Sequence, residues 1–289
     1  MPDKETGLPG LSPEVLPILL RDHTTGRNIF WATHDYEALG SPYDYHAEIL
    51  PQLITGEHSM VVRPRVLKTK ENQTDRSKDM AEVFTPSWIC NAQNNLVCDA
   101  LPKEMSWQDF VRTTCLEITC GEAPYLVSRY DATTGDLIPL HRRIGLLDRK
   151  LSLVSKNTET PDEWHQWARI AYQHTYGYEW QGDNLLLARL NLLHSYLDYY
   201  EARFGQTPPP HCINDIADII SWNLWQMDGL KCGIPGHEPT ESLEDDFCNT
   251  FFPPAPEERY CRIRDWDTNE EVRYIDLLTA PTKPPRWEA

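Results

Sequence analysis

The chain has 289 residues, 40% of them hydrophobic, so it is long enough for one large domain with a substantial core. No stretch approaches the roughly 20 apolar residues of a membrane span, and the first ten residues, MPDKETGLPG, lack the apolar segment of a signal peptide. These features predict a cytoplasmic protein with no membrane contact. The eight cysteines are scattered without a CxxC pair, so no metal site is expected and free core thiols are the favoured interpretation.

The net charge of −17 argues against strong independent binding to DNA, because a protein that grips a phosphate backbone normally has a basic face. The basic residues do form two local clusters. These are Arg63, Arg65, Lys68, Lys70, Arg76 and Lys78, and then Arg142, Arg143, Arg149 and Lys150. A solvated surface explains them at least as well as a nucleic-acid contact.

The first half of the chain gives few secure elements, and residues 12–60 fit no clear pattern. Thr85 and Pro86 resemble an N-cap and a first helical residue, so a helix is expected to begin near Ser87. Residues 111–118 are typical of a buried strand. A short helix opened by proline is predicted over 124–129, and the long insertion at 131–160 has no assigned role.

The second half alternates more clearly. Thr160 and Glu163 form a capping box around Pro161, which predicts a helix to about residue 174. A strand over 175–180, a helix over 182–205 closed by Gly205, a helix over 213–220 and a strand over 221–228 follow, and a strand pair is expected near 260–263 and 272–277. This alternation of strands and helices favours a parallel α/β sheet.

Ligands of such sheets bind beyond the carboxyl ends of the strands, and three predicted strands end in suggestive residues. The first ends in Glu117 and a turn at Gly121, the second in Glu179 and Trp180, and the third in Asp228. Each has an ordinary structural explanation: a tight turn, a surface acid beside a core tryptophan, and a turn aspartate. Together they favour an edge that binds a nucleoside.

Four stretches, at 82–89, 116–126, 176–193 and 223–230, resemble the S-adenosylmethionine half of gamma-type N6-adenine DNA methyltransferases, the restriction–modification "subunit M" family. The likeness covers roughly residues 60–278. It implies part of a Rossmann-like S-adenosylmethionine-dependent methyltransferase fold, with an N-terminal extension over 1–75, a cofactor-binding domain over 76–278 and a tail over 279–289.

The resemblance also implies roles for the candidate residues. Thr85 and Pro86 would lie near the methionine end of S-adenosylmethionine, and Glu117 and Gly121 would form the cofactor loop. Glu179 would bind the ribose. Trp180 would pack against the adenine, and Asp228 would accept a hydrogen bond from the adenine amino group. Two loop positions depart from the family pattern: Thr119 stands where proline is usual, and Ala123 where a second glycine is usual. Alanine is expected to fit if its φ is negative.

The family's catalytic motif, in which Asn, Asp or Ser precedes Pro-Pro and an aromatic residue, is absent. None of the proline clusters at 207–211, 251–256 and 283–287 fits it, so no catalytic residue is assigned. We therefore expect a second protein chain to supply the NPPY-type loop and most DNA contacts, pairing with an exposed edge of the first strand. The alternatives are a non-catalytic regulatory or specificity subunit, and an inactive fragment.

Overall fold

The computed structural model describes residues 14–68, 85–235 and 260–279. Its centre is a parallel sheet of three strands in the order β1 (Cys115–Glu117), β2 (Thr175–Glu179) and β3 (Leu224–Gln226). Cys115 pairs with Thr175, and Gly177 pairs with Leu224. The prediction of an α/β protein with a parallel sheet and flanking helices is confirmed.

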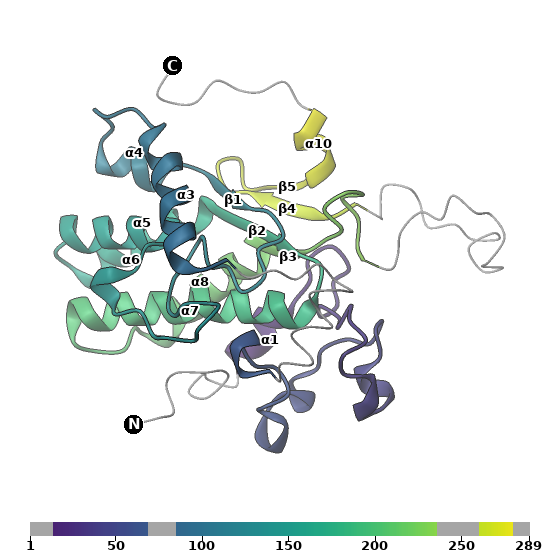
Figure 1. Cartoon of the computed structure of the whole chain (residues 1–289). Helices are drawn as coiled ribbons and strands as arrows, with labels where there is room; N and C mark the ends of the chain where they lie inside the picture. The colour runs from purple at the N-terminus through teal and green to yellow at the C-terminus, as the bar shows by residue number, and fades with distance from the viewer. Residues whose placement is uncertain (1–13, 69–84, 236–259, 280–289) are drawn as a thin grey trace.

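Four helices cover one face of the sheet (Figure 1). Helices α5 (Leu146–Asn157) and α6 (Pro161–Gln173) connect β1 to β2, and α7 (Gly182–Phe204) and α8 (Pro210–Asn223) connect β2 to β3. The predicted insertion at 131–160 therefore contains α5, which packs against both α6 and α7. Helix α7 is buried on nearly all sides, as expected of a helix enclosed by protein.

The helix boundaries follow local chemistry. The Thr160 side chain accepts the Glu163 N–H, as the capping box predicts, and Gly205 ends α7 in the left-handed conformation with φ 69°. Helix α8 is longer than predicted, since Ser221, Trp222 and Asn223 belong to it and not to the strand.

A smaller layer covers part of the opposite face. Strands β4 (Arg262–Asp265) and β5 (Glu270–Arg273) form an antiparallel hairpin, and α10 (Tyr274–Thr279) follows directly. Tyr178, Trp225 and Tyr274 pack together between this layer and the sheet. The predicted strand over 272–277 is thus wrong beyond Arg273, because the chain turns into a helix whose first residue, Tyr274, fills this aromatic cluster.

The N-terminal residues 14–68 pack into the same hydrophobic core as the helices. Helix α1 (Val15–Leu20) lies against α8. The rest of the segment is irregular apart from single 3₁₀ turns, η1 (Glu37–Leu39), η2 (Ser41–Tyr43), η3 (Pro51–Leu53), η4 (Gly56–His58) and η5 (Arg65–Leu67). In Figure 1 this segment, in purple, lies beside the end of α7 that follows β2.

Helices α3 (Ser87–Asp99) and α4 (Trp107–Val111) precede β1, and the turn η6 (Leu140–Arg142) precedes α5. Three local predictions are corrected here. Residue 111 ends α4, so the strand begins only at 115. Pro86, not Thr85, is the N-cap of α3, and no side chain caps that helix. Residues 124–129 make a single turn and no helix, because Ile138 then donates to the Arg129 carbonyl and draws the chain into an extended bridge.

Candidate cofactor site

The turn that follows β1 is hydrogen-bonded to the carboxyl end of the neighbouring strand β2. The Cys120 N–H donates to the Tyr178 carbonyl over 2.8 Å, which continues the pairing of β1 with β2. The next N–H, that of Gly121, donates to Glu179 Oε2 over 2.8 Å. The predicted residues Gly121 and Glu179 therefore lie in direct contact, at the carboxyl ends of adjacent parallel strands.

Glu117, the last residue of β1, organises the other half of the turn. Its two carboxylate oxygens accept the N–H groups of Tyr125 and Leu126, over 3.3 and 3.1 Å. These bonds hold residues 120–126 as a compact loop, and they account for the single turn found where a helix was predicted. Glu117 and Glu179 therefore have the same structural role, since each accepts hydrogen bonds from backbone N–H groups of this loop.

The loop backbone is left-handed at alternate positions: φ is 46° at Thr119, 54° at Gly121 and 62° at Ala123. The condition under which alanine was expected to fit, a negative φ at Ala123, is therefore not met. The conformation of Thr119 also explains a departure from the family pattern, since proline is fixed near φ −65° and cannot adopt a φ of 46°. In this chain the loop has a shape that the usual proline does not allow.

Burial changes the acidity of both carboxyl groups. Loss of solvent raises the pKa of Glu179 to about 7, opposed by the N–H groups of Gly121 and Gln181. Loss of solvent also raises the pKa of Glu117 to about 8, and the nearby charge of Glu179 adds to this effect. The pair therefore titrates near neutral pH.

The start of α3 lies close to the same acids. The Cys90 thiol contacts the Thr85 carbonyl oxygen at 3.6 Å, and burial followed by the charge of Glu117 raises the pKa of Cys90 to about 11. Thr85 and Pro86 are both partly exposed. Through Cys90, the start of α3 therefore lies near Glu117.

Trp180, in contrast, faces the N-terminal segment. Its indole N–H donates to the Tyr45 hydroxyl over 3.0 Å. The Gln226 side chain accepts the Phe30 N–H and donates to the Phe30 carbonyl, and its amide nitrogen also donates to the Trp180 carbonyl. A Cβ at Gly182 would lie 2.1 Å from the Phe30 carbonyl oxygen. The backbone around Phe30 therefore packs so closely against the start of α7 that only glycine fits at position 182.

Asp228 is placed apart from the acids of the turn. Its Oδ1 accepts the N–H groups of Leu230 and Lys231, over 2.8 and 3.2 Å, and the Cys232 N–H donates to its carbonyl. This is the turn aspartate of the ordinary structural explanation. The structure therefore brings together Glu117, Gly121 and Glu179, with Thr85 and Pro86 close by, and gives Trp180 and Asp228 separate partners.

A buried ion pair that the sequence did not indicate lies at the first turn of α7. Asp183 Oδ2 accepts from Lys68 Nζ over 2.9 Å and from the Tyr36 hydroxyl over 2.7 Å. Lys68 belongs to a basic cluster for which the sequence left open a solvated surface or a nucleic-acid contact, and its partner lies 115 residues further along the chain. No local sequence pattern could have paired them.

No family model, no curated protein and no solved structure matches the chain. Among the described residues no group of three His, Cys, Asp or Glu side chains is arranged to hold a metal ion. Across the same residues, every helix is too short or too polar to cross a membrane.

Proposed function

We propose that the chain binds S-adenosylmethionine at the carboxyl ends of β1 and β2, as the cofactor-binding part of a DNA adenine-N6 methyltransferase of a restriction–modification system. The observation that carries the proposal is the meeting of Glu117 and Glu179 at the Gly121 turn. Parallel strands joined through helices, with an acid at the second strand end, fit a partial Rossmann-like methyltransferase fold. The proposal rests on this geometry and on the sequence resemblance.

The residues of the turn fit the chemistry of that cofactor. A carboxylate at the position of Glu179 can accept both ribose hydroxyl hydrogens, and to do so it would release the Gly121 N–H to the cofactor. S-adenosylmethionine would supply the methyl group on its sulfonium. The adenine end fits less well, since the Asp228 carboxylate is used within its own turn.

A second chain would complete the enzyme. Within the described residues β1 is an edge strand. Leu116 in this strand is 41% exposed, and Ile118 directly after it is 62% exposed. The proline cluster at 208–210 lies between α7 and α8, at the end of α7 that is distant from the Gly121 turn. This position supports the view that the cluster does not form a catalytic loop at the cofactor site. The clusters at 251–256 and 283–287 lie outside the described residues. The partner would provide the loop that accepts the adenine amine and most of the DNA contacts.

The alternative is a non-catalytic regulatory or specificity subunit with a methyltransferase-like fold. Two observations favour it: Asp228 closes a turn, and Trp180 binds Tyr45 of the N-terminal segment. Both residues would have to change partners if they were to hold adenine.

Calorimetric titration of the purified chain with S-adenosylmethionine tests the proposal. We expect binding that Glu179→Ala weakens at least about ten-fold, because two hydrogen bonds to a charged acceptor are lost. Glu104→Ala removes an exposed acid from the turn before α4 and is the matched control. Equal affinities for wild type and Glu179→Ala, with unchanged thermal midpoints, would contradict the proposed site. Methyl transfer to DNA after co-expression with the partner separates the enzyme from the non-catalytic subunit.

A further inference from the structure

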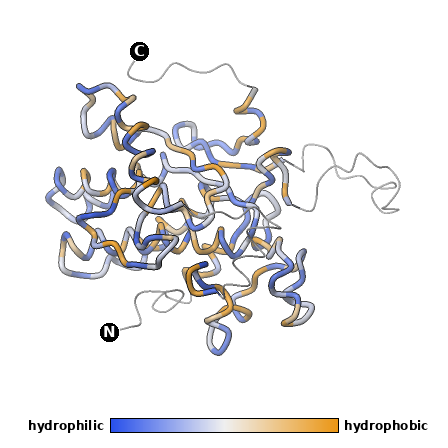
Figure 2. Tube along the Cα trace, viewed as in Figure 1, coloured by the Kyte–Doolittle hydropathy of each residue, from blue (hydrophilic) through white to orange (hydrophobic). Residues whose placement is uncertain are grey.

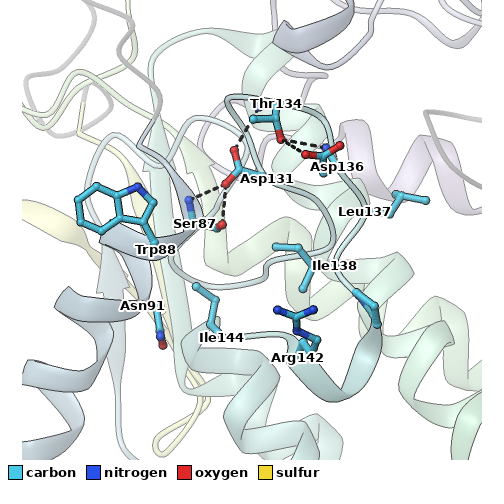
Figure 3. Close-up of a pocket in the computed structure, with 11 residues that line it drawn as sticks. Ser87, Trp88, Asn91, Asp131, Thr134, Asp136, Leu137, Ile138, Arg142 and Ile144 are labelled. Carbon is cyan, nitrogen blue, oxygen red and sulfur yellow. Dashed lines mark hydrogen bonds between the residues drawn. The ribbon is translucent and has the colours of Figure 1, made fainter.

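A cavity of about 390 Å³ lies between the first turn of α3 and residues 131–144, and one of its lining residues, Ser87, directly follows the candidate pair Thr85 and Pro86. Figure 3 shows its lining side chains, which come from α3 on one side and from this segment on the other. A volume of this size falls in the range of sites that bind small organic ligands. Neither the resemblance nor the proposed function assigns a role to these residues.

The walls of the cavity are held in place by partly buried polar contacts. Asp131 Oδ2 accepts the Ser87 N–H over 2.8 Å and its hydroxyl over 2.5 Å, which ties the segment to the start of α3. Further along the helix, the Asn94 amide donates to the carbonyls of Tyr125 and Ile144. The cavity is therefore part of the fixed structure of this region.

Its lining combines an aromatic ring, aliphatic side chains and one cation. Trp88 is 72% exposed at the side of the cavity, and Ile138 and Ile144 supply aliphatic surface between it and Arg142 (Figure 3). An indole this exposed gains little from the fold, so its ring is free to stack on a planar ligand. Asn91 and Asp136 add an amide and a carboxylate to the lining.

Arg142 differs from the other basic residues of its cluster. Arg143 pairs with Asp198 over 2.6 Å, Arg149 donates to Asn91 and Asn95 of α3, and Lys150 is buried among main-chain carbonyls. Arg142 is exposed, and its side chain makes no hydrogen bond or ion pair with the described residues, although its main-chain N–H donates to the Pro139 carbonyl. Of this cluster, it alone offers a free guanidinium to a ligand in the cavity.

We infer that this cavity binds a single unpaired nucleotide, whose base stacks on Trp88 over the aliphatic wall and whose phosphate binds Arg142. A base has a π-face for the indole and an apolar edge for the isoleucines, and a guanidinium recognises phosphate by charge-assisted hydrogen bonds. The same chemistry is present in a free mononucleotide and in a nucleotide of a single strand. A paired base in a duplex has no exposed face to offer.

A deoxyadenosine hexanucleotide carrying one 2-aminopurine is the probe, because the fluorescence of 2-aminopurine falls when it stacks on an aromatic ring. We expect the wild-type chain to quench it on titration. Trp88→Ala should weaken binding at least about five-fold, and Trp88→Phe should recover most of the loss. Arg142→Gln should lower the slope of log affinity against log salt concentration by about 0.7, the value for one phosphate of a single strand.

Matched variants keep the test specific. Leu96→Ala removes an exposed apolar side chain of the same helix outside the cavity, and Lys103→Gln removes an exposed cation outside it. Both should bind like wild type. Adenosine monophosphate that displaces the probe identifies a mononucleotide site, and its failure to do so identifies a site for a strand. Absence of quenching up to millimolar protein, or equal affinity of wild type and Trp88→Ala, overturns the inference. Titration of Trp88→Ala with S-adenosylmethionine keeps this failure distinct from failure of the cofactor site.

Discussion

The Gly121 N–H donates to the Glu179 carboxylate over 2.8 Å, so the end of the second strand holds the turn that follows the first. The proposed ribose binding would therefore compete with this hydrogen bond for one carboxylate. Burial raises the pKa of this group to about 7. Its protonation state then matters both for stability and for ligand binding.

Stability is expected to fall as the pH rises from about 4.5 to about 7. The pKa of Glu179 rises from 4.5 in the unfolded chain to about 7 in the fold, so the native state keeps a proton that the unfolded chain has released. The contribution is complete below the unfolded pKa and lost above the folded one. We expect Glu179→Gln to remove on the order of 2 kcal/mol of this pH dependence. Denaturant unfolding between pH 4 and 8 measures it, and Glu104→Gln should retain the wild-type slope. A Glu179→Gln curve parallel to wild type would show that this group does not titrate in the window.

Binding of S-adenosylmethionine, if Glu179 accepts the ribose hydroxyls, should strengthen over the same pH range. The ionised carboxylate accepts two hydrogens, whereas the protonated group keeps one oxygen as a donor. Below its pKa of about 7 the group must therefore release a proton on binding. Calorimetry at pH 6 in buffers of different ionisation enthalpy counts that proton. A proton count of zero would place the ribose elsewhere.

Thr119 is the residue where the loop backbone is most strained, because a β-branched side chain at φ 46° is crowded against the main chain. The side chain is exposed, so no packing is lost when it is removed. We expect Thr119→Gly to stabilise the protein by about 1 kcal/mol, seen as a rise of about 2 °C in the thermal midpoint. Asn269→Gly, at φ 61°, is the control and should change stability less, since asparagine tolerates this conformation.

Thr119→Pro tests the same loop in the opposite direction. The proline of the family pattern requires a φ near −65°, so the loop must rearrange and the free energy of unfolding should fall by about 3 kcal/mol. A proline variant as stable as wild type would mean that the loop also adopts the family's conformation.

The sequence predicted best those elements whose signals are local. The capping box at Thr160, the alternation through 175–205 and the glycine that ends α7 each depend on residues within a few positions of one another. The turn at Gly121 was predicted, but the helix over 124–129 was wrong, because Glu117, eight residues before Tyr125, binds the main chain there. The contacts of Trp180 with Tyr45, and of Asp183 with Lys68, join segments more than 100 residues apart. Such pairings arise only from the folded arrangement.

Arg189 is a further example of a long-range contact, and it should be essential for stability. It is fully buried in α7, and its guanidinium donates to the carbonyls of Leu19, Ser221 and Leu224, and also to that of Arg21. Lysine has fewer donors and no planar fork, so Arg189→Lys leaves buried carbonyls unsatisfied. We expect a loss of about 3 kcal/mol in the free energy of unfolding, measured by urea denaturation. Arg203→Lys, an exposed residue with one bond to the Thr158 carbonyl, should cost less than about 1 kcal/mol.

The last prediction concerns self-association through the unpaired edge of β1. Leu116 in β1 and Ile118 directly after it are exposed, and α10 adds exposed Leu277 and Leu278 on the same side of the sheet as the β4–β5 layer. In Figure 2 the hydrophobic residues of α10 are orange on a helix at the periphery of the molecule. An unpaired strand edge with apolar side chains promotes pairing with another chain.

We therefore expect the isolated protein to associate with itself as its concentration rises, and Ile118→Lys to suppress this, because a lysine at a strand edge opposes pairing. Sedimentation equilibrium over a hundred-fold range of concentration measures the effect. Leu230→Lys makes the same change at a residue that is 95% exposed in the turn after β3, and it should associate like wild type. Neither variant should change the free energy of unfolding by more than about 0.5 kcal/mol, since both side chains are on the surface. If Leu230→Lys suppresses association equally, general charge is the cause and the β1 edge is not the contact.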